Sequence, residues 1–226
     1  MYINFVSCYI LEYKFNSKMS NLNLFSQLTR KIFHDLINPA SAALNGMELL
    51  KYNLAEKKDQ ILDDETFQLL ETSIKKITAQ IKFFRFCYSD PITQQHDNLS
   101  IIHISSVIND YFDFTKLKIS HRADLVHLDK KYAILLTNTI IIFLNLFPVG
   151  AEIYFDLVDQ KGFVIKVNNQ TGKINTDILQ DFYTTNSDNI ENIQVRYLHE
   201  LLNIYNLNKV VSANDMEVSI EFIEQI

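Results

Sequence analysis

The residues best suited to chemistry lie between Lys31 and Pro39, where a histidine, an acid and an amide occur at helical spacing on an otherwise apolar segment. Apolar residues recur around them in steps of three, four and seven, which predicts one apolar helix face. They are Phe25, Leu28, Ile32, Leu36, Ala43, Met47 and Leu50. His34 lies about 200° around such a helix from Ile32, so it is expected to face solvent or a partner. We predict that the His34 imidazole carries a phosphoryl group, because a neutral histidine nitrogen is a competent nucleophile toward an acyl phosphate.

The side chains that follow His34 have types that assist this chemistry. Asp35 can accept a hydrogen bond from the second ring nitrogen, which fixes the tautomer and stabilises imidazolium-like charge. Asn38, one turn later, can orient a water molecule or the phosphoryl group. The residues expected to contact a partner are Lys31, Ser41, Ala42 and Asn45. A helical histidine alone is most often an ordinary surface residue, but the acid at +1, the amide at +4 and the proline at +5 favour phosphoryl transfer.

Two helices are expected to position these residues. The first should begin at Asn21 or Asn23, bend at Pro39 and end near Asn53. A polar connection over residues 54–63 then leads into a second helix, in which apolar residues alternate steps of three and four. This apolar seam comprises Phe67, Leu70, Ile74, Ile77, Ile81, Phe84 and Tyr88. A two-helix hairpin cannot bury both of its apolar faces alone, which favours a homodimer forming a four-helix bundle. Burial of the seam by the following domain of the same chain is the alternative.

A second domain is expected to follow the hairpin. Ser89-Asp90-Pro91 ends the helical pattern, and the polar residues 93–98 are typical of a linker. We place the boundary near residue 92. This gives an N-terminal extension or a misassigned start with Met19 as the true first residue (1–19), a helical-hairpin dimerisation domain (20–92) and an α/β sandwich domain (93–226). In the sandwich domain, helices are expected over residues 105–115, 131–147, 176–182 and 190–205. Strands are expected over residues 117–120, 152–158, 163–167, 209–212 and 217–222, in a largely antiparallel sheet, so the predicted fold class is α+β.

Composition argues against several classes of function. The 226 residues carry a formal charge of −6 and no basic stripe, so nucleic-acid binding is not expected. The two cysteines and the five other histidines lack metal-ligand spacing, which predicts no metal site and a reducing, cytoplasmic location. Only four glycines occur, so no glycine-rich phosphate loop can be written. The uncharged run from Tyr132 to Ala151 contains polar residues and predicts a buried helix rather than a membrane span. The stretch from Met1 to Phe15 lacks the features of a signal peptide.

The run His34-Asp35-Leu36-Ile37-Asn38-Pro39 resembles the histidine box of sensor histidine kinases. Two further runs, Asn45-Gly46-Met47-Glu48-Leu49-Leu50 and Lys82-Phe83-Phe84-Arg85-Phe86, make the pattern more similar to the ChpT family of alphaproteobacterial histidine phosphotransferases. In that family a dimeric helical-hairpin bundle is followed by a degenerate copy of the kinase ATP-binding domain. The resemblance covers about residues 20–226. The resemblance is specific in sequence over the histidine box, and after residue 93 it concerns only the order of helices and strands.

Three departures from the kinase pattern argue against a nucleotide site. Asn138 aligns with the first asparagine of the kinase N box, but Ile142 stands where a kinase needs its magnesium-binding asparagine. Residues 169–174 lack the acid and the glycine pattern of the next box. Residues 193–196 are Ile-Gln-Val-Arg where a kinase has a Gly-Leu-Gly-Leu turn. We expect these four residues just before a helix, where their side chains would obstruct the approach of phosphates to the backbone.

The resemblance implies a histidine phosphotransferase of a phosphorelay, acting in cell-cycle control. Its partners would be the receiver domain of a hybrid histidine kinase, which donates the phosphoryl group to His34, and receiver domains of response regulators, which accept it. The receivers would supply Mg²⁺, and this chain would bind neither ATP nor another cofactor. Two alternatives stay open. One is an ATP-dependent histidine kinase fragment, and the other is a non-catalytic dimeric adaptor that binds receivers without accepting phosphate.

Overall fold

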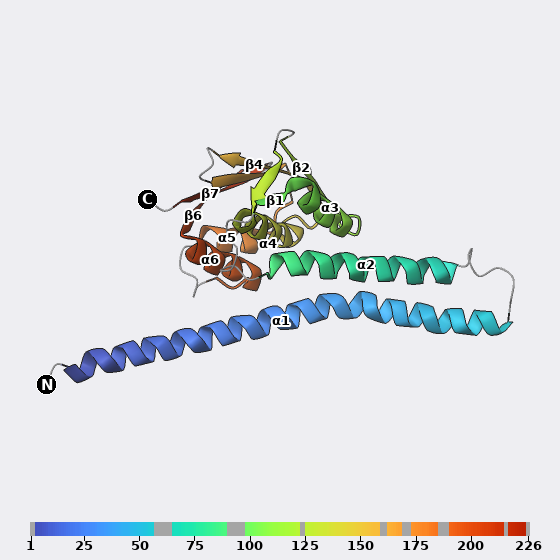
Figure 1. The fold of residues 1–226 in the computed structure, drawn as a ribbon, viewed down its shortest axis with the longest axis horizontal. Helices are drawn as coiled ribbons and strands as arrows, with labels where there is room; N and C mark the ends of the chain where they lie inside the picture. Colours follow the sequence, from blue (N-terminus) through green and yellow to red (C-terminus); the bar gives the residue numbers. More distant parts are fainter. Residues whose placement is uncertain are drawn as a thin grey trace.

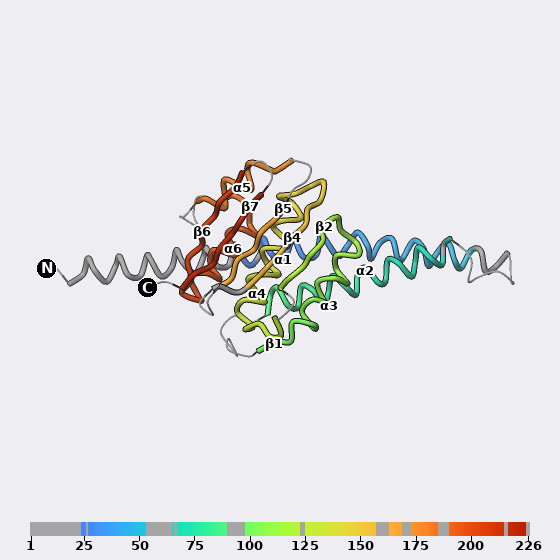
Figure 2. The backbone as a smooth tube through the Cα atoms, turned by 90° about the horizontal axis from the view of Figure 1, so that it is seen from above, coloured from blue at the N-terminus to red at the C-terminus, as the bar shows by residue number. Residues whose placement is uncertain are grey.

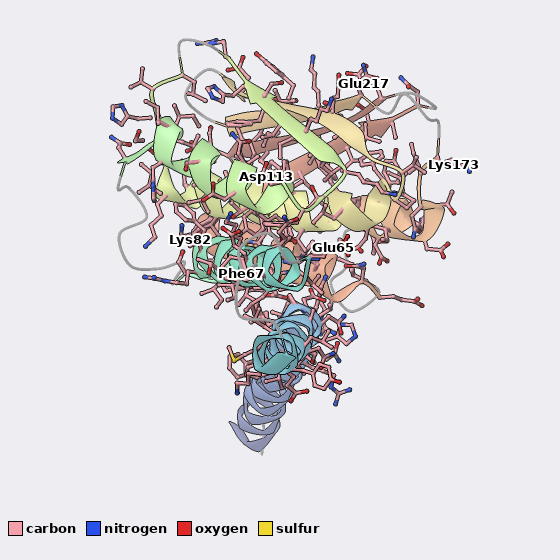
Figure 3. The ribbon with its side chains drawn as sticks, turned by 90° about the vertical axis from the view of Figure 1, so that its right-hand side faces the viewer. Glu65, Phe67, Lys82, Asp113, Lys173 and Glu217 are labelled. Carbon is pink, nitrogen blue, oxygen red and sulfur yellow. The ribbon has the colours of Figure 1, made fainter. Side chains whose placement is uncertain are left out.

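The computed structural model describes residues 3–56, 65–89, 98–122, 125–158, 162–168, 173–184, 190–214 and 217–224; in the first helix it describes the side chains of residues 24, 25 and 27–52. Two long antiparallel helices, α1 (Ile3–Glu56) and α2 (Glu65–Cys87), lie beneath a domain made of a sheet and shorter helices (Figure 1). Figure 3 looks along this hairpin and shows α2 between α1 and the second domain. The predicted α+β fold class is confirmed.

The first helix is longer than predicted. It begins at Ile3 instead of Asn21 or Asn23, because no glycine or proline precedes Pro39 to end a helix earlier. The residues assigned to an N-terminal extension therefore belong largely to α1. The helix continues through Pro39 and changes direction in its middle part (Figure 1), as proline predicts. From residue 57 on, the expected connection to α2 lies outside the described residues.

The second domain contains a five-stranded sheet with helices on one face. Its elements in chain order are β1 (Asn98–Ser100), α3 (Ile101–Phe112), β2 (Leu117–His121), β3 (His127–Asp129), α4 (Lys130–Leu146), β4 (Ala151–Val158), β5 (Gly162–Asn168), α5 (Thr176–Tyr183), α6 (Ile193–Tyr205), β6 (Leu207–Ala213) and β7 (Glu217–Glu224). The strand order is β2-β4-β5-β7-β6, parallel between β2 and β4 and antiparallel elsewhere. Figure 2 views this sheet from the side opposite the hairpin. The largely antiparallel pairing predicted from the sequence is confirmed.

Several predicted boundaries are wrong by a few residues. The short antiparallel pair β1 and β3 was not predicted, and α3 begins at Ile101 rather than at residue 105. Helix α6 begins at Ile193, because the Asn192 side chain caps it by accepting hydrogen bonds from the N–H groups of Gln194 and Val195. Residues 193–196 therefore form the first turn of the helix instead of preceding it. The boundary near residue 92 lies outside the described residues, as do residues 169–172.

The core lies between the sheet and α4. Alternate residues of β4 and β7 are buried, including Phe155 and Phe222, and α4 is buried from Tyr132 to Phe143. The prediction of a buried helix over this uncharged stretch is confirmed. Within the part of the chain that the structure describes, no helix has both the length and the apolar character needed to cross a membrane.

Helix α1 buries different sides along its length. Leu28 is buried, and Ile32 and Leu36 pack against the core, as the predicted apolar face requires. Phe25 and Met47 were assigned to the same face but are 67% and 43% exposed. The assignment is wrong for these two residues because α1 contacts α6 as well as α2, so its buried side is not a single straight stripe.

Candidate functional site

The His34 imidazole stands out from α1 into solvent, as its position off the apolar face predicted. Its side chain is 75% exposed, and its Nδ1 atom lies 3.4 Å from Oδ1 of Asp35, whose side chain is 37% exposed. This distance is long for a hydrogen bond, so the contact orients the ring only weakly in the unbound chain. Because Nδ1 faces the carboxylate, Nε2 is the nitrogen left for a partner. The pair can present a neutral imidazole with the Nε2 lone pair directed outward.

The other predicted site residues lie along the same helix and differ in exposure. Asn38, Ser41 and Asn45 are exposed, whereas Lys31 and Ala42 are half-buried. Burial lowers the pKa of Lys31, and the negative charge of Asp35 opposes that shift. The structure therefore brings all predicted site residues to α1 within a few turns of His34. Their roles in transfer and in partner binding stay predictions.

Two tyrosines, Tyr88 just after α2 and Tyr111 on α3, are affected by the charge of Asp35. Burial raises the pKa of Tyr88 and of Tyr111, and the negative charge of Asp35 adds to both shifts. The Tyr111 ring stacks on Phe83 with ring centroids 4.2 Å apart. Both phenols therefore keep their protons, so they cannot act as the base in a transfer reaction. The sequence indicated Tyr88 only as part of the α2 seam and gave no sign of Tyr111.

A buried chain of hydrogen bonds fastens the end of α2 to the second domain. The Tyr88 hydroxyl donates to Oε1 of Gln194 over 2.9 Å, and Nε2 of Gln194 donates to Oδ1 of Asn138 over 2.7 Å. Nδ2 of Asn138 in turn donates to the Cys87 and Ile134 carbonyl oxygens, over 2.8 Å each. Asn138 and Gln194 are fully buried. Sequence reasoning missed this chain because its members are 51 to 106 residues apart.

The same chain occupies positions that the kinase resemblance assigns to a nucleotide site. The amide groups of Asn138 and Gln194 hydrogen-bond to each other, and Asn138 also donates to the Cys87 carbonyl oxygen of α2. Ile142 is fully buried. None of these three side chains is directed into an open cavity described by the structure. The residues of the intervening box, 169–172, lie outside the described ranges.

The described cavities are separate from His34. The largest of them, about 660 Å³, lies where α2 meets α3 and is lined by no residue of α1. Among the residues that the structure describes, no three histidine, cysteine, aspartate or glutamate side chains are grouped so as to hold a metal ion. Chemistry at His34 is therefore expected to use the polar groups beside it on α1, such as Asp35 and Asn38, and groups supplied by a partner.

Replacing Tyr88 with phenylalanine is expected to lower the free energy of unfolding by about 1–3 kcal/mol, because Oε1 of the buried Gln194 loses its donor. Urea unfolding followed by circular dichroism measures the change. Tyr154→Phe, at a tyrosine that is exposed on β4, is the control and should change stability by less than about 0.5 kcal/mol. Equal effects of the two substitutions would contradict the role given to the hydrogen-bonded chain.

Comparisons with known proteins bear on the family of the chain and on its fold. Residues 102–217, just over half of the chain, match a family model described as the histidine phosphotransferase C-terminal domain. The protein phosphotransferase ChpT of Brucella abortus (strain 2308) is 26% identical over 135 residues, which are 60% of this chain and 61% of that protein. The chain thus spans about three-fifths of the length of that relative. A solved bacterial phosphotransferase shares the fold with a TM-score of 0.68 at 21% identity, over 89% of this chain and 96% of the other.

Proposed function

Because this chain belongs to the histidine phosphotransferase family by its match over residues 102–217, we propose that it relays a phosphoryl group through His34. The donor is the phosphorylated receiver domain of a hybrid histidine kinase, and the acceptors are receiver domains of response regulators. The observation that carries the proposal is the exposed His34 imidazole, with Asp35 against one ring nitrogen and the other nitrogen directed to solvent. The relay is placed in the cytoplasm, where receivers act.

The proposed step exchanges one phosphorus bond for another. The Nε2 lone pair of neutral His34 attacks the phosphorus of the receiver's aspartyl phosphate, so that an N–P bond forms as the O–P bond breaks. The bonding electrons of the broken bond return to the receiver's carboxylate. Positive charge develops on the ring, and the carboxylate of Asp35 stabilises it at Nδ1–H. Mg²⁺ held by the receiver neutralises the phosphoryl oxygens. The reverse step hands the group to the next receiver.

A reconstituted relay tests this proposal. A purified receiver carrying ³²P on its aspartate is mixed with this chain and with a second, unlabelled receiver, in the absence of any kinase and of ATP. We expect acid-labile label on the chain and acid-labile, base-labile label on the second receiver, and we expect the latter only when the chain is present. If several receivers bind the chain and none labels it, the adaptor alternative becomes the better account.

We also propose that the chain uses no ATP. The buried contacts of Asn138 and Gln194 and the burial of Ile142 support this, since these positions correspond to nucleotide-binding groups in the kinase resemblance. We expect no saturable binding of MgATP up to about 1 mM, the upper end of ordinary substrate affinities, in equilibrium dialysis. Saturable binding together with label transfer from γ-³²P-ATP to His34 would favour the kinase alternative instead.

The hairpin leaves apolar stripes exposed on both helices, and we propose that a second copy of this chain covers them. On α1, Phe33, Ile37 and Leu44 are each about 60% exposed, and on α2 the seam residues Ile74 and Ile81 are 48% and 45% exposed. The second domain leaves both side chains about half exposed, although Ile74 lines a cavity of about 330 Å³ together with Asp110 and Phe114 of that domain. The heptad spacing of Ile74 and Ile81 suits a four-helix bundle of two hairpins. The partner then presents a second His34.

The dimer is tested by placing a charge in the stripe. Ile74→Glu is expected to weaken self-association by about a hundredfold or more, because a twofold interface would bury the unpaired carboxylate twice. Sedimentation equilibrium measures this. Ile102→Glu, at an apolar residue that is 78% exposed on α3 and outside the stripe, serves as the control and should leave the dimer intact. A monomeric wild-type chain at micromolar concentration would refute the proposal.

A further inference from the structure

A small cavity of about 280 Å³ lies between α5, α6 and the edge strand β6. Its lining includes Phe182, Tyr183 and His199 together with Lys209. None of these residues takes part in the site on α1. Among the described residues that line this cavity, Lys209 is the only one with a primary amine.

Lys209 is held in place by contacts from α5. Its Nζ atom donates a hydrogen bond to the Thr184 carbonyl oxygen over 3.2 Å and lies 5.9 Å from the centroid of the Phe182 ring. The side chain is half-buried, and that burial lowers the pKa of Lys209 to about 8, with the charge of Asp181 opposing the shift. At pH 7 about a tenth of these side chains are then neutral, against about one in 2,500 for an ordinary lysine.

We propose that Lys209 is an acyl-acceptor site, at which the ε-amine takes an acyl group from a small acyl phosphate. The amine lone pair attacks the carbonyl carbon, an N–C amide bond forms, and the C–O bond to the phosphate breaks. Inorganic phosphate leaves with the bonding electrons, and the proton of the amine passes to water. The product keeps an N–H that can still donate to the Thr184 carbonyl oxygen, but its positive charge beside Phe182 is gone.

The size of the cavity selects the donor. Pockets that hold drug-sized ligands measure about 300–1,000 Å³, so a cavity of about 280 Å³ suits a donor no larger than a short acyl phosphate. Within the described residues, the Phe182 ring and the Thr184 carbonyl oxygen are the groups that contact the amine beside this cavity.

The charged and titratable groups around Lys209 define how the site responds to pH. Asp181 and Tyr183 face it from α5, and His199 faces it from α6. On the neighbouring strand β7 its partner is the apolar Phe222. Reaction rates are therefore compared above pH 7, beyond the range in which an ordinary histidine titrates.

The test is site-resolved mass spectrometry of the full chain after treatment with acetyl phosphate. At pH 7.5 we expect Lys209 to be acetylated at least about tenfold faster than Lys118, an exposed lysine on the opposite edge strand β2 of the same sheet. The larger neutral fraction of Lys209 outweighs the lower nucleophilicity of a less basic amine. The Lys209 rate should level off above about pH 8.

Two further measurements keep this result unambiguous. In 8 M urea the preference for Lys209 should disappear, because the cavity is lost, and Lys209→Arg should remove the fast site from the folded chain. Equal acetylation rates at Lys209 and Lys118 in the folded chain would overturn the proposal. The assay uses no receiver and counts acetyl groups on lysine, so its outcome is independent of phosphoryl transfer at His34.

Discussion

Replacing His34 with alanine is expected to abolish acceptance of a phosphoryl group, with a loss greater than a thousandfold in the transfer rate. The substitution removes the nucleophile itself, and among the described residues near it Asp35 and the protonated Tyr88 and Tyr111 offer no substitute. Because the side chain is 75% exposed, its removal should leave the fold and receiver affinity almost unchanged. Transfer is measured with a ³²P-labelled receiver, and affinity with fluorescence anisotropy.

His127→Ala is the matched control for this substitution. His127 is also an exposed histidine, but it lies on β3 of the second domain. Its replacement should leave both transfer and receiver affinity within about twofold of the wild type. Transfer that survives in His34→Ala, or that fails in His127→Ala, would remove His34 from the centre of the mechanism.

Replacing Asp35 with asparagine is expected to lower the transfer rate about a hundredfold. The carboxylate orients the ring through Nδ1 and stabilises the positive charge that develops on it, and general acid–base partners of this kind contribute about 10²–10⁴-fold. We expect the lower end of this range because Nδ1 of His34 and Oδ1 of Asp35 are 3.4 Å apart and the Asp35 side chain is 37% exposed. The effect should appear in the rate at saturating receiver rather than in receiver affinity. Rapid-quench kinetics separates the two.

Glu48→Gln removes the same charge from the same helix and controls for long-range electrostatics. Glu48 is exposed on α1, three turns or more beyond the histidine. We expect less than a threefold change in rate for this variant. If Asp35→Asn and Glu48→Gln slow the transfer equally, the carboxylate acts through the general field of the helix and does not position the ring.

The local pattern of α1 predicted the site well because the relevant information is short-range. The exposure of His34 follows from the angle between it and Ile32, and the approach of Asp35 follows from adjacency. The same reasoning failed for Phe25 and Met47, since their exposure depends on which distant element covers each turn of the helix. Phe33, Ile37 and Leu44 form an exposed stripe whose members are four and seven residues apart, as in a heptad pattern. A search of the sequence for a second apolar face on this helix would have identified them.

The second domain was predicted in its strand pairing but not in its polar interior. Alternation of apolar residues indicates strands, and the turn-like residues between them indicate antiparallel neighbours. Nothing in the sequence near Gln194 indicates that its amide meets Asn138 and Tyr88, because these contacts depend on the packing of three separate helices. The same holds for Lys209, whose surroundings come from α5 and α6.

The central claim is that His34 is the residue that carries the phosphoryl group, and locating that group on the wild-type chain tests it most directly. The chain is incubated with a phosphorylated receiver without ATP, and the product is examined by ³¹P NMR and by peptide mapping under alkaline conditions. The account predicts a phosphoramidate on Nε2 of His34. A phosphoryl group on any other residue, or no phosphoramidate on a chain that binds the receiver, would contradict it.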